Sequence, residues 1–216
     1  MSSRSSIDGG GSKTHALAAS LEGKVLAEAS GAASNYHSVG KEAAYLALDN
    51  VLGKLLEQFG SQVQVKAACL GMAGAGAAEG VSLYQSWAER RLPGAQVLVT
   101  HDARLALEAG SVAGWGIAVL CGTGSMVYGR DGEGREARAG GWGWLLGDEG
   151  SAYAIGASAL HTVCRSADGS SAPTVLTALV LEAWGLKDAS ELVRRVYALP
   201  FPRAEIASLA TLVEKA

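Results

Sequence analysis

The chain reads Ile7-Asp-Gly-Gly-Gly-Ser-Lys-Thr14 near its start and Leu120-Cys-Gly-Thr-Gly-Ser-Met126 in its middle. Each stretch is an apolar residue, a glycine-rich turn with a hydroxyl group, and the beginning of another strand. Glycine lets a backbone approach a ligand closely, and successive N–H groups of such a turn form a cradle for an anion. The repeat predicts two lobes with one phosphate-binding hairpin each; the alternative is two unrelated turns in a glycine-rich chain.

The first turn offers several groups to a phosphate. Gly10 and Gly11 free the backbone amides, Ser12 adds a hydroxyl and Lys13 a positive charge. Asp8, at the end of the preceding strand, is a candidate to hold Mg²⁺ through water, because this ion prefers carboxylate oxygens and keeps much of its hydration shell. The alternative is a tight hairpin with an exposed lysine.

The second turn has the same logic. Gly122 and Gly124 allow close approach of phosphate oxygens, while Thr123 and Ser125 supply hydroxyl and amide donors. Neither turn matches the P-loop pattern or the GxGxxG dinucleotide pattern. Two such turns predict that one polyphosphate is gripped between them.

Hydrophobic periodicity predicts strands that alternate with helices, which is typical of an α/β protein. We expect strands at 14–20, 25–29, 65–70, 96–100, 117–121 and 126–130. Helices are expected from a cap at Ser38, at 80–92 and at 103–109, and the pattern from 151 onward is almost wholly helical. The strand–turn–strand pattern restarts after residue 112, which predicts one domain over 1–112 and a second over 113–216.

Asp102 follows Val97-Leu-Val-Thr-His101 and is expected at the carboxyl end of a buried strand, where open α/β sheets place their ligand sites. A carboxylate there can accept a proton from a hydroxyl group that attacks phosphorus. The alternative is a helix N-cap, a role that aspartate fills well and that is compatible with the first. We favour Asp102 over His101 as the base, since a histidine in this place more often packs in the core or supports a neighbouring side chain.

The segment Gly140-Gly-Trp-Gly-Trp-Leu-Leu-Gly-Asp-Glu-Gly-Ser151 is the most distinctive of the chain. So many glycines are costly to order, which favours a loop that presents amides and an aromatic face to a polyhydroxylated ring. Asp148 is a candidate acceptor for sugar hydroxyls. The alternative is a buried tryptophan pair under a helix-capping turn. Asn35, in a loop after a strand, could also read hydroxyl groups.

Composition excludes several classes of function. The chain has 216 residues, 49% hydrophobic and 18% charged, with a formal net charge of -3. Without clusters of lysine and arginine, neither nucleic acid nor a membrane is an expected partner. The three cysteines are isolated, so no zinc or iron–sulfur site is expected. No signal-peptide pattern is present, and we expect a cytoplasmic protein whose partners are small molecules or further copies of itself, as in a homodimer.

Taken together, these motifs resemble the N-acetylglucosamine kinases of the BadF/BadG/BcrA/BcrD-type ATPase group, within the actin/hexokinase/Hsp70 superfamily. The two glycine turns, Leu70-Gly-Met-Ala-Gly74, Thr100-His-Asp-Ala103 and the 140–153 segment carry the resemblance, in the family's order and over nearly the whole chain. It implies two ribonuclease-H-like (actin-like ATPase) lobes that close over MgATP and sugar, with phosphoryl transfer to the 6-hydroxyl of N-acetyl-D-glucosamine.

The resemblance also assigns roles to residues. It makes Asp102 the catalytic base. The positions that match the family's sugar contacts are Asn35, Asp102, Gly141, Trp142, Gly143 and Asp148. Those that match its ATP contacts are Ser12, Thr123 and, by a weaker alignment, Ala207.

Two departures from the family pattern lead to further expectations. The polar residues 2–6 predict a first strand that is cut short, since family members begin with an apolar strand. Family chains also continue beyond the position of Ala216 into an adenosine-binding turn, so the second lobe is expected to be incomplete. The alternatives within this reading are a kinase for N-acetylmuramic acid or glucosamine, and a non-catalytic sugar-binding remnant. An iron–sulfur ATPase activator is disfavoured, because its paired cysteines are lacking.

Overall fold

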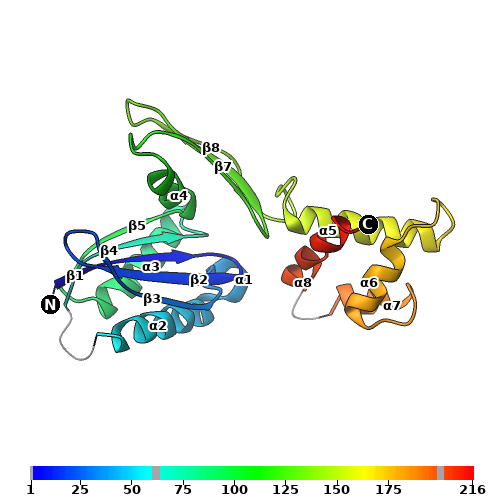
Figure 1. Cartoon of the computed structure of the whole chain (residues 1–216), viewed down its shortest axis with the longest axis horizontal. Helices are drawn as coiled ribbons and strands as arrows, with labels where there is room; N and C mark the ends of the chain where they lie inside the picture. The colour runs from blue at the N-terminus through cyan, green and yellow to red at the C-terminus, as the bar shows by residue number, and fades with distance from the viewer. Residues whose placement is uncertain (1, 60–63, 199–201) are drawn as a thin grey trace. The chain divides into compact units, whose positions relative to one another are not determined.

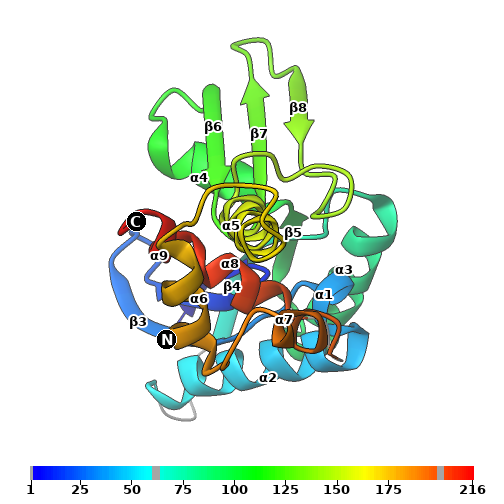
Figure 2. The same cartoon turned by 90° about the vertical axis from the view of Figure 1, so that its right-hand side faces the viewer.

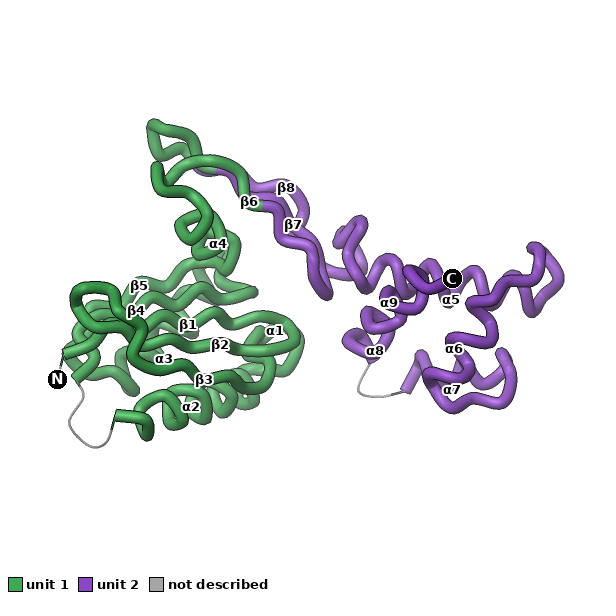
Figure 3. The backbone as a smooth tube through the Cα atoms, viewed as in Figure 1, with its two compact units in different colours: residues 1–118, 130–135 green, residues 119–129, 136–216 purple. Residues whose placement is uncertain are grey.

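The computed structural model describes residues 2–59, 64–198 and 202–216. The chain divides into two compact units (Figure 3). Unit 1 comprises residues 1–118 and 130–135, and unit 2 comprises residues 119–129 and 136–216. The α/β class is confirmed, whereas the domain boundary at 112/113 stays a prediction.

Unit 1 is built on a mixed five-stranded sheet in the order β3-β2-β1-β4-β5 (Figure 1). Its strands are β1 (Ser2–Gly9), β2 (Lys13–Ala19), β3 (Val25–Ala32), β4 (Gln64–Met72) and β5 (Gln96–Thr100). β2 is antiparallel to both of its neighbours, β1 and β3, whereas β1, β4 and β5 are parallel. Asp8 pairs with Gly71, which pairs with Thr100, so the carboxyl ends of the three parallel strands share one edge.

The prediction of a shortened first strand is wrong. β1 begins at Ser2 and runs through the middle of the sheet, with Ser3, Ser5 and Ile7 buried. Backbone pairing on both sides satisfies the strand, and serine is small enough to pack at its buried positions. The Ser5 hydroxyl donates to the Leu17 carbonyl oxygen at 3.2 Å, which lets a polar side chain stay in the core.

Helices cover both faces of this sheet. They are α1 (Tyr36–Val39), α2 (Lys41–Glu57), α3 (Ala78–Arg91) and α4 (Asp102–Gly110). The core between α2, α3 and the sheet contains Leu48, Tyr84 and, from β4, Leu70. On the opposite face of the sheet, a Cβ atom at Gly71 would stand 2.1 Å from Leu105 Cδ1 of α4. The expected helix cap at Ser38 is wrong: Asn35 caps α1 instead, and α2 begins after Gly40.

A second sheet has three strands that lie side by side in the order β6-β7-β8 (Figure 2). They are β6 (Gly116–Cys121), β7 (Ser125–Arg130) and β8 (Glu136–Gly140). The expected turn at Asp131 connects β7 and β8: the Gly134 N–H donates to the Asp131 carbonyl oxygen at 3.0 Å. β8 itself was not predicted, because its short sequence Glu-Ala-Arg-Ala-Gly lacks apolar alternation and all but its last residue are exposed.

Unit 2 is otherwise helical, as the sequence predicts. Its helices are α5 (Ala152–Ala167), α6 (Leu176–Trp184), α7 (Glu191–Val196), α8 (Arg203–Ser208) and α9 (Ala210–Val213). They enclose a small core around Val163, Val180 and Ile206. Gly156 of α5 faces the backbone of α8, where a Cβ atom would stand 1.9 Å from the Ile206 carbonyl oxygen. No helix of the described residues could cross a membrane.

Candidate active site

The turn between β1 and β2 is tied to two neighbouring segments of unit 1. The Gly10 N–H donates to the Lys13 carbonyl oxygen at 2.9 Å, and the Gly10 carbonyl oxygen accepts from the Ser34 N–H at 3.3 Å. Gly9 lies so close to Met72 and Ser34 that a Cβ atom there would stand 2.2 Å from Met72 Cε. The turn is therefore held at the sheet edge by the chain that follows β3 and by the end of β4.

Asp8 and Asp102 face the same edge of the sheet from β1 and from the segment after β5. Desolvation raises the pKa of the Asp8 carboxyl, and the charges of His15 and Lys13 offset part of that effect. Desolvation also raises the pKa of the Asp102 carboxyl; the negative charge of Asp8 adds to this, while the Ala103 N–H and His101 oppose it. Asp8 is thus close enough to Asp102 for its charge to help raise the pKa of the Asp102 carboxyl.

Asp102 is the first residue of α4, and its Oδ1 accepts from the Ala103 N–H at 2.9 Å. The capping role that we considered for Asp102 belongs to His101, whose Nδ1 accepts from the Arg104 N–H at 3.2 Å. His101 therefore fixes the start of the helix. The second oxygen of Asp102 accepts from no side chain that the structure describes, as a proton acceptor requires.

Asn35 lies in the loop after β3, and Tyr84 positions that loop. The buried Tyr84 hydroxyl donates to the Ser34 carbonyl oxygen at 2.7 Å and accepts from the Tyr36 N–H at 3.2 Å. Burial raises the pKa of Tyr84 to about 12. Asn35 Oδ1 accepts from the His37 N–H at 3.1 Å, and its Nδ2 amide donates to no residue that the structure describes.

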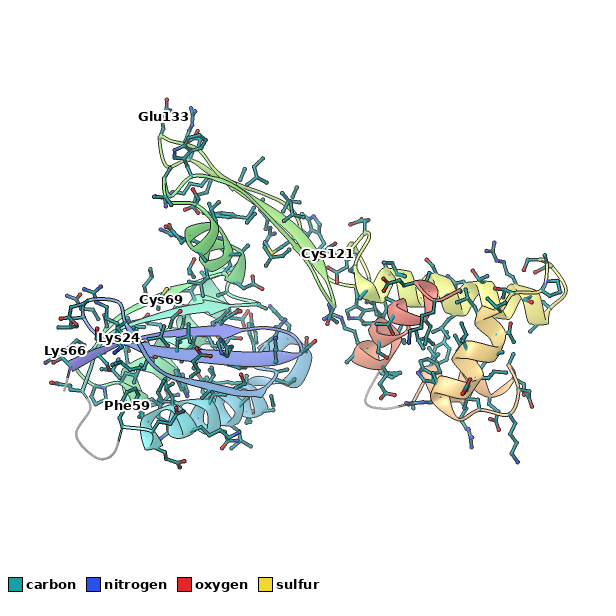
Figure 4. The ribbon with its side chains drawn as sticks, viewed as in Figure 1. Lys24, Phe59, Lys66, Cys69, Cys121 and Glu133 are labelled. Carbon is teal, nitrogen blue, oxygen red and sulfur yellow. The ribbon has the colours of Figure 1, made fainter. Side chains whose placement is uncertain are left out.

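In unit 2 the second glycine turn and the end of β6 are joined to the segment 148–152 by hydrogen bonds of Cys121, Gly122 and Ser125. Ser125 provides two of them: its N–H donates to Asp148 Oδ1 at 3.1 Å and its hydroxyl to the Glu149 carbonyl oxygen at 2.8 Å. Cys121, labelled in Figure 4, donates its Sγ–H to the Gly150 carbonyl oxygen at 3.3 Å. The Ala152 N–H donates to the Gly122 carbonyl oxygen at 2.9 Å. The two most distinctive motifs of the sequence therefore form one structural element.

Asp148 is the centre of this element. Its side chain is buried, and Arg203 donates to its Oδ2 at 3.0 Å. Among the described residues it is the one non-glycine residue with a positive φ, at 61°. Gly124 packs against the carboxylate, since a Cβ atom at that position would stand 2.8 Å from Asp148 Oδ2.

Several glycines of the loop before Asp148 have backbone conformations that favour glycine. Gly141 and Gly143 have φ values of 70° and 83°, which other residues rarely adopt. Trp142 between them is 66% exposed, so the alternative of a buried tryptophan pair is wrong. The Arg138 guanidinium lies 5.5 Å from the centre of the Trp142 ring. Trp142 is thus an exposed aromatic ring with a cation over it.

The candidate residues are distributed over both units. Unit 1 holds Asp8, Asn35, Asp102 and the turn from Gly10 to Lys13, and unit 2 holds the turn from Gly122 to Ser125, the loop from Gly141 to Asp148, and Ala207. Ala207 is buried on α8. Two residues with clear supporting roles, Tyr84 and Arg203, were missed, because they act on segments 50 and 55 residues away in sequence.

The donor set at the edge of unit 1 suits a magnesium ion that is bound largely by water and substrate. Among the described residues, no three histidine, cysteine, aspartate or glutamate side chains gather around one point. Mg²⁺ in phosphoryl-transfer sites typically uses one or two carboxylates together with phosphate oxygens and water. Asp8, an exposed residue whose carboxyl is partly desolvated, fits that requirement.

Known proteins with similar sequences are amino-sugar kinases. The chain is 38% identical over 211 residues to the N-acetylmuramic acid/N-acetylglucosamine kinase of Clostridium acetobutylicum. This match covers 97% of the chain and 69% of that kinase. It is 36% identical over 201 residues to the N-acetyl-D-glucosamine kinase of Dictyostelium discoideum, covering 88% of this chain and 63% of the relative. The chain therefore spans about two thirds of the length of these relatives.

A solved structure is also similar to this chain. The crystal structure of a protein from Chromobacterium violaceum, provisionally assigned as an N-acetylglucosamine kinase, superposes with a TM-score of 0.80 at 28% identity. The match covers 99% of this chain and 74% of that protein. A family model, described as the BadF/BadG/BcrA/BcrD ATPase family, matches residues 7–209. Since this match includes both glycine turns, Asp102 and the 140–151 segment, the chain belongs to the BadF/BadG/BcrA/BcrD ATPase family.

Proposed function

We propose that this chain is an ATP-dependent sugar kinase that phosphorylates N-acetyl-D-glucosamine at its 6-hydroxyl. The observation that carries the proposal is the placement of Asp102 at the carboxyl end of β5, beside Asp8 and on the sheet edge that holds the Gly10–Lys13 turn. The kinases named above support the substrate class. They are longer than this chain, so the activity and substrates of the whole protein are part of the proposal.

Asp102 is the general base in this mechanism. Its free oxygen accepts the proton of the sugar 6-hydroxyl as that oxygen attacks the γ-phosphorus of ATP. The bond between the γ-phosphorus and the bridging oxygen breaks, and ADP leaves. A pKa raised by desolvation makes the carboxylate a stronger proton acceptor than an ordinary aspartate.

The glycine turns hold the phosphates of ATP. In unit 1 the Gly11 amide, the Ser12 hydroxyl and the Lys13 ammonium group bind the phosphates, and Asp8 would hold Mg²⁺ through water. Gly10 shapes this turn, because its N–H donates to the Lys13 carbonyl oxygen. In unit 2 the cradle consists of Gly122, Thr123 and Gly124, with Ala207 near the nucleotide. Ser125 supports the cradle, because both of its donors are engaged by the segment 148–149.

The sugar is bound by Asn35, Gly141, Trp142, Gly143 and Asp148 together with Asp102. The free Nδ2 amide of Asn35 is a donor for a sugar oxygen, and the exposed Trp142 ring offers a flat apolar face to the sugar ring. The reaction takes place in the cytoplasm, where ATP is supplied. We also propose that residues 1–112 and 113–216 are two ribonuclease-H-like lobes, the second of them incomplete, and that the protein forms a homodimer.

N-Acetylmuramic acid is the second candidate substrate. It carries a carboxylate that N-acetylglucosamine lacks, and the exposed Arg138 beside Trp142 has no ion-pair partner among the described residues. The kinase from Clostridium acetobutylicum is named for both sugars. Replacing Arg138 by Met should raise the KM for N-acetylmuramic acid and leave the KM for N-acetylglucosamine unchanged.

A coupled assay of ADP release with N-acetylglucosamine, N-acetylmuramic acid and glucosamine tests the proposal. Turnover with none of the three would overturn it. Sugar binding by calorimetry without ATP binding would indicate a non-catalytic sugar-binding protein. Mass and NMR analysis of the product would identify the phosphorylated hydroxyl.

Three glycine variants test the phosphate turns. A Cβ atom at Gly11 or Gly122 meets no protein atom within 4 Å, and neither residue has a positive φ. Gly11→Ala and Gly122→Ala should therefore fold normally and raise the KM for ATP, because the methyl group occupies the space of the phosphate. Gly132→Ala is the matched control, since this residue lies in an equally open turn between β7 and β8. An unchanged KM for ATP in both turn variants would remove the turns from the nucleotide site.

A further inference from the structure

The ion pair between Asp148 and Arg203 joins parts of unit 2 that are 55 residues apart in sequence. The Asp148 side chain is 4% exposed and that of Arg203 is 23% exposed. Asp148 Oδ1 is occupied by the Ser125 N–H, so each carboxylate oxygen has its own donor. Hydrogen bonds at both oxygens fix the orientation of the Asp148 carboxylate. The backbone of Asp148 is in the left-handed region, with a φ of 61°.

The position of Arg203 is set by the packing of two helices. Gly156 lacks a side chain, so the backbone of α8 at Ile206 approaches α5 closely enough to bring the first residue of α8 to Asp148. Arg203 also acts on Tyr153 in the first turn of α5, where its positive charge lowers a pKa that burial raises. The centres of the Tyr153 and Trp144 rings are 5.5 Å apart, in an edge-to-face arrangement. Arg203 is thus linked through Tyr153 to Trp144, which belongs to the same loop as Trp142.

We propose that Arg203 is a positioning residue, which acts through Asp148 to hold the sugar-binding loop and the Gly122–Ser125 turn in one fixed arrangement. The guanidinium neutralises a buried carboxylate next to a turn that receives phosphate, and it orients the same carboxylate for the sugar hydroxyls. An ionised carboxylate accepts up to about four hydrogen bonds. Among the described residues, Ser125 and Arg203 provide two donors to Asp148, so acceptor capacity remains for the sugar. This inference rests on the proposed function.

A double-mutant cycle in the full chain tests the inference. The proteins are wild type, Asp148→Asn, Arg203→Met and the double variant, with KM and kcat measured separately for the sugar and for ATP. Arg203→Met should raise the KM for the sugar about tenfold and for ATP to a smaller extent, with kcat changed less than KM. In the Asp148→Asn background the same replacement should change the KM for the sugar less than about twofold, because its partner is already gone.

Two further variants make the result specific. Arg203→Lys keeps a cation in the site and should recover part of the sugar affinity; it also serves as the test variant if Arg203→Met does not fold. Arg194→Met, on the exposed side of α7, is the matched control and should leave both KM values unchanged.

Equal increases of the sugar KM in both backgrounds would overturn the proposal, as would a lowered Tm with unchanged KM, which is the signature of a purely structural ion pair. If the wild-type chain phosphorylates no amino sugar, the proposed function fails and this inference fails with it. If the wild type is active and the cycle shows no coupling, the inference about Arg203 alone is wrong.

Discussion

The Tyr84 hydroxyl on α3 donates to the Ser34 carbonyl oxygen at 2.7 Å and accepts from the Tyr36 N–H at 3.2 Å, so that one side chain spans both neighbours of Asn35. Asn35 is thereby held from behind by a residue that cannot itself reach a ligand, because Tyr84 is fully buried. With its pKa raised to about 12, the phenol is neutral at any working pH, and this support does not vary with pH.

Tyr84→Phe should destabilise the protein and weaken sugar binding together. The substitution leaves a buried carbonyl oxygen and an N–H group without their partner, which costs about 1–3 kcal/mol. Denaturant unfolding measures the first effect, and calorimetric titration with N-acetylglucosamine measures the second. Tyr45→Phe is the control, since the Tyr45 hydroxyl donates to the Leu83 carbonyl oxygen, away from Asn35. If Tyr84→Phe loses stability and keeps full sugar affinity, Tyr84 does not position Asn35.

Asp102→Asn should abolish turnover and lower sugar affinity only modestly. A general base contributes a factor of about 10²–10⁴ to the rate, and asparagine has no basic oxygen, although its Oδ1 can still accept from the Ala103 N–H. Single-turnover measurements with ATP and sugar separate the loss of chemistry from any loss of binding. Turnover close to that of the wild type would exclude Asp102 as the base.

The same substitution should stabilise the folded protein at neutral pH. Because the pKa of folded Asp102 lies above its ordinary value of 3.8, folding disfavours the ionised carboxylate. The wild type therefore gains stability as the pH falls through the raised pKa, and this gain is complete below 3.8. The neutral Asp102→Asn variant should melt at a higher temperature than the wild type at pH 7, and the difference should shrink as the pH approaches 4. A Tm difference that is constant with pH would contradict the raised pKa.

Local pattern was enough to predict much of the fold. The strand at 96–100 was placed with its observed bounds, because the run Val97-Leu-Val99 is apolar and bounded by turn residues. The same reasoning failed to predict a strand at residues 2–6, because the burial of Ser3 and Ser5 depends on the pairing of β2 and β4 on either side of β1. β8 was missed for a similar reason: its pairing with β7, rather than its own sequence, makes it a strand.

In the candidate site, too, the sequence indicated some residues, whereas others were identified only from the fold. Asp102, Asp148 and the glycine turns stand out in sequence because polar residues and glycines follow apolar runs. Their supports do not stand out, since Tyr84 and Arg203 look like ordinary helix residues until the fold brings them to Ser34 and Asp148. The role of Gly156 was equally invisible, because only the packed α8 shows why a side chain is not tolerated there.

Gly156→Ala and Gly53→Ala should have opposite effects on stability, although the chemical change is the same. Both glycines lie inside helices, where alanine is favoured over glycine by about 0.5–1 kcal/mol. A Cβ atom at Gly53 on α2 meets nothing within 4 Å, so Gly53→Ala should gain about that amount. At Gly156 the new methyl group would stand 1.9 Å from the Ile206 carbonyl oxygen and must push α8 away from α5. Overpacking of this kind costs about 1–3 kcal/mol.

Denaturant unfolding of both variants measures these differences. Because a displaced α8 withdraws Arg203 from Asp148, Gly156→Ala should also raise the KM for the sugar, as Arg203→Met does, whereas Gly53→Ala should leave it unchanged. Loss of stability in Gly156→Ala without any change in KM would show that α8 can move without disturbing the carboxylate. In that case the close approach of α5 and α8 serves packing alone.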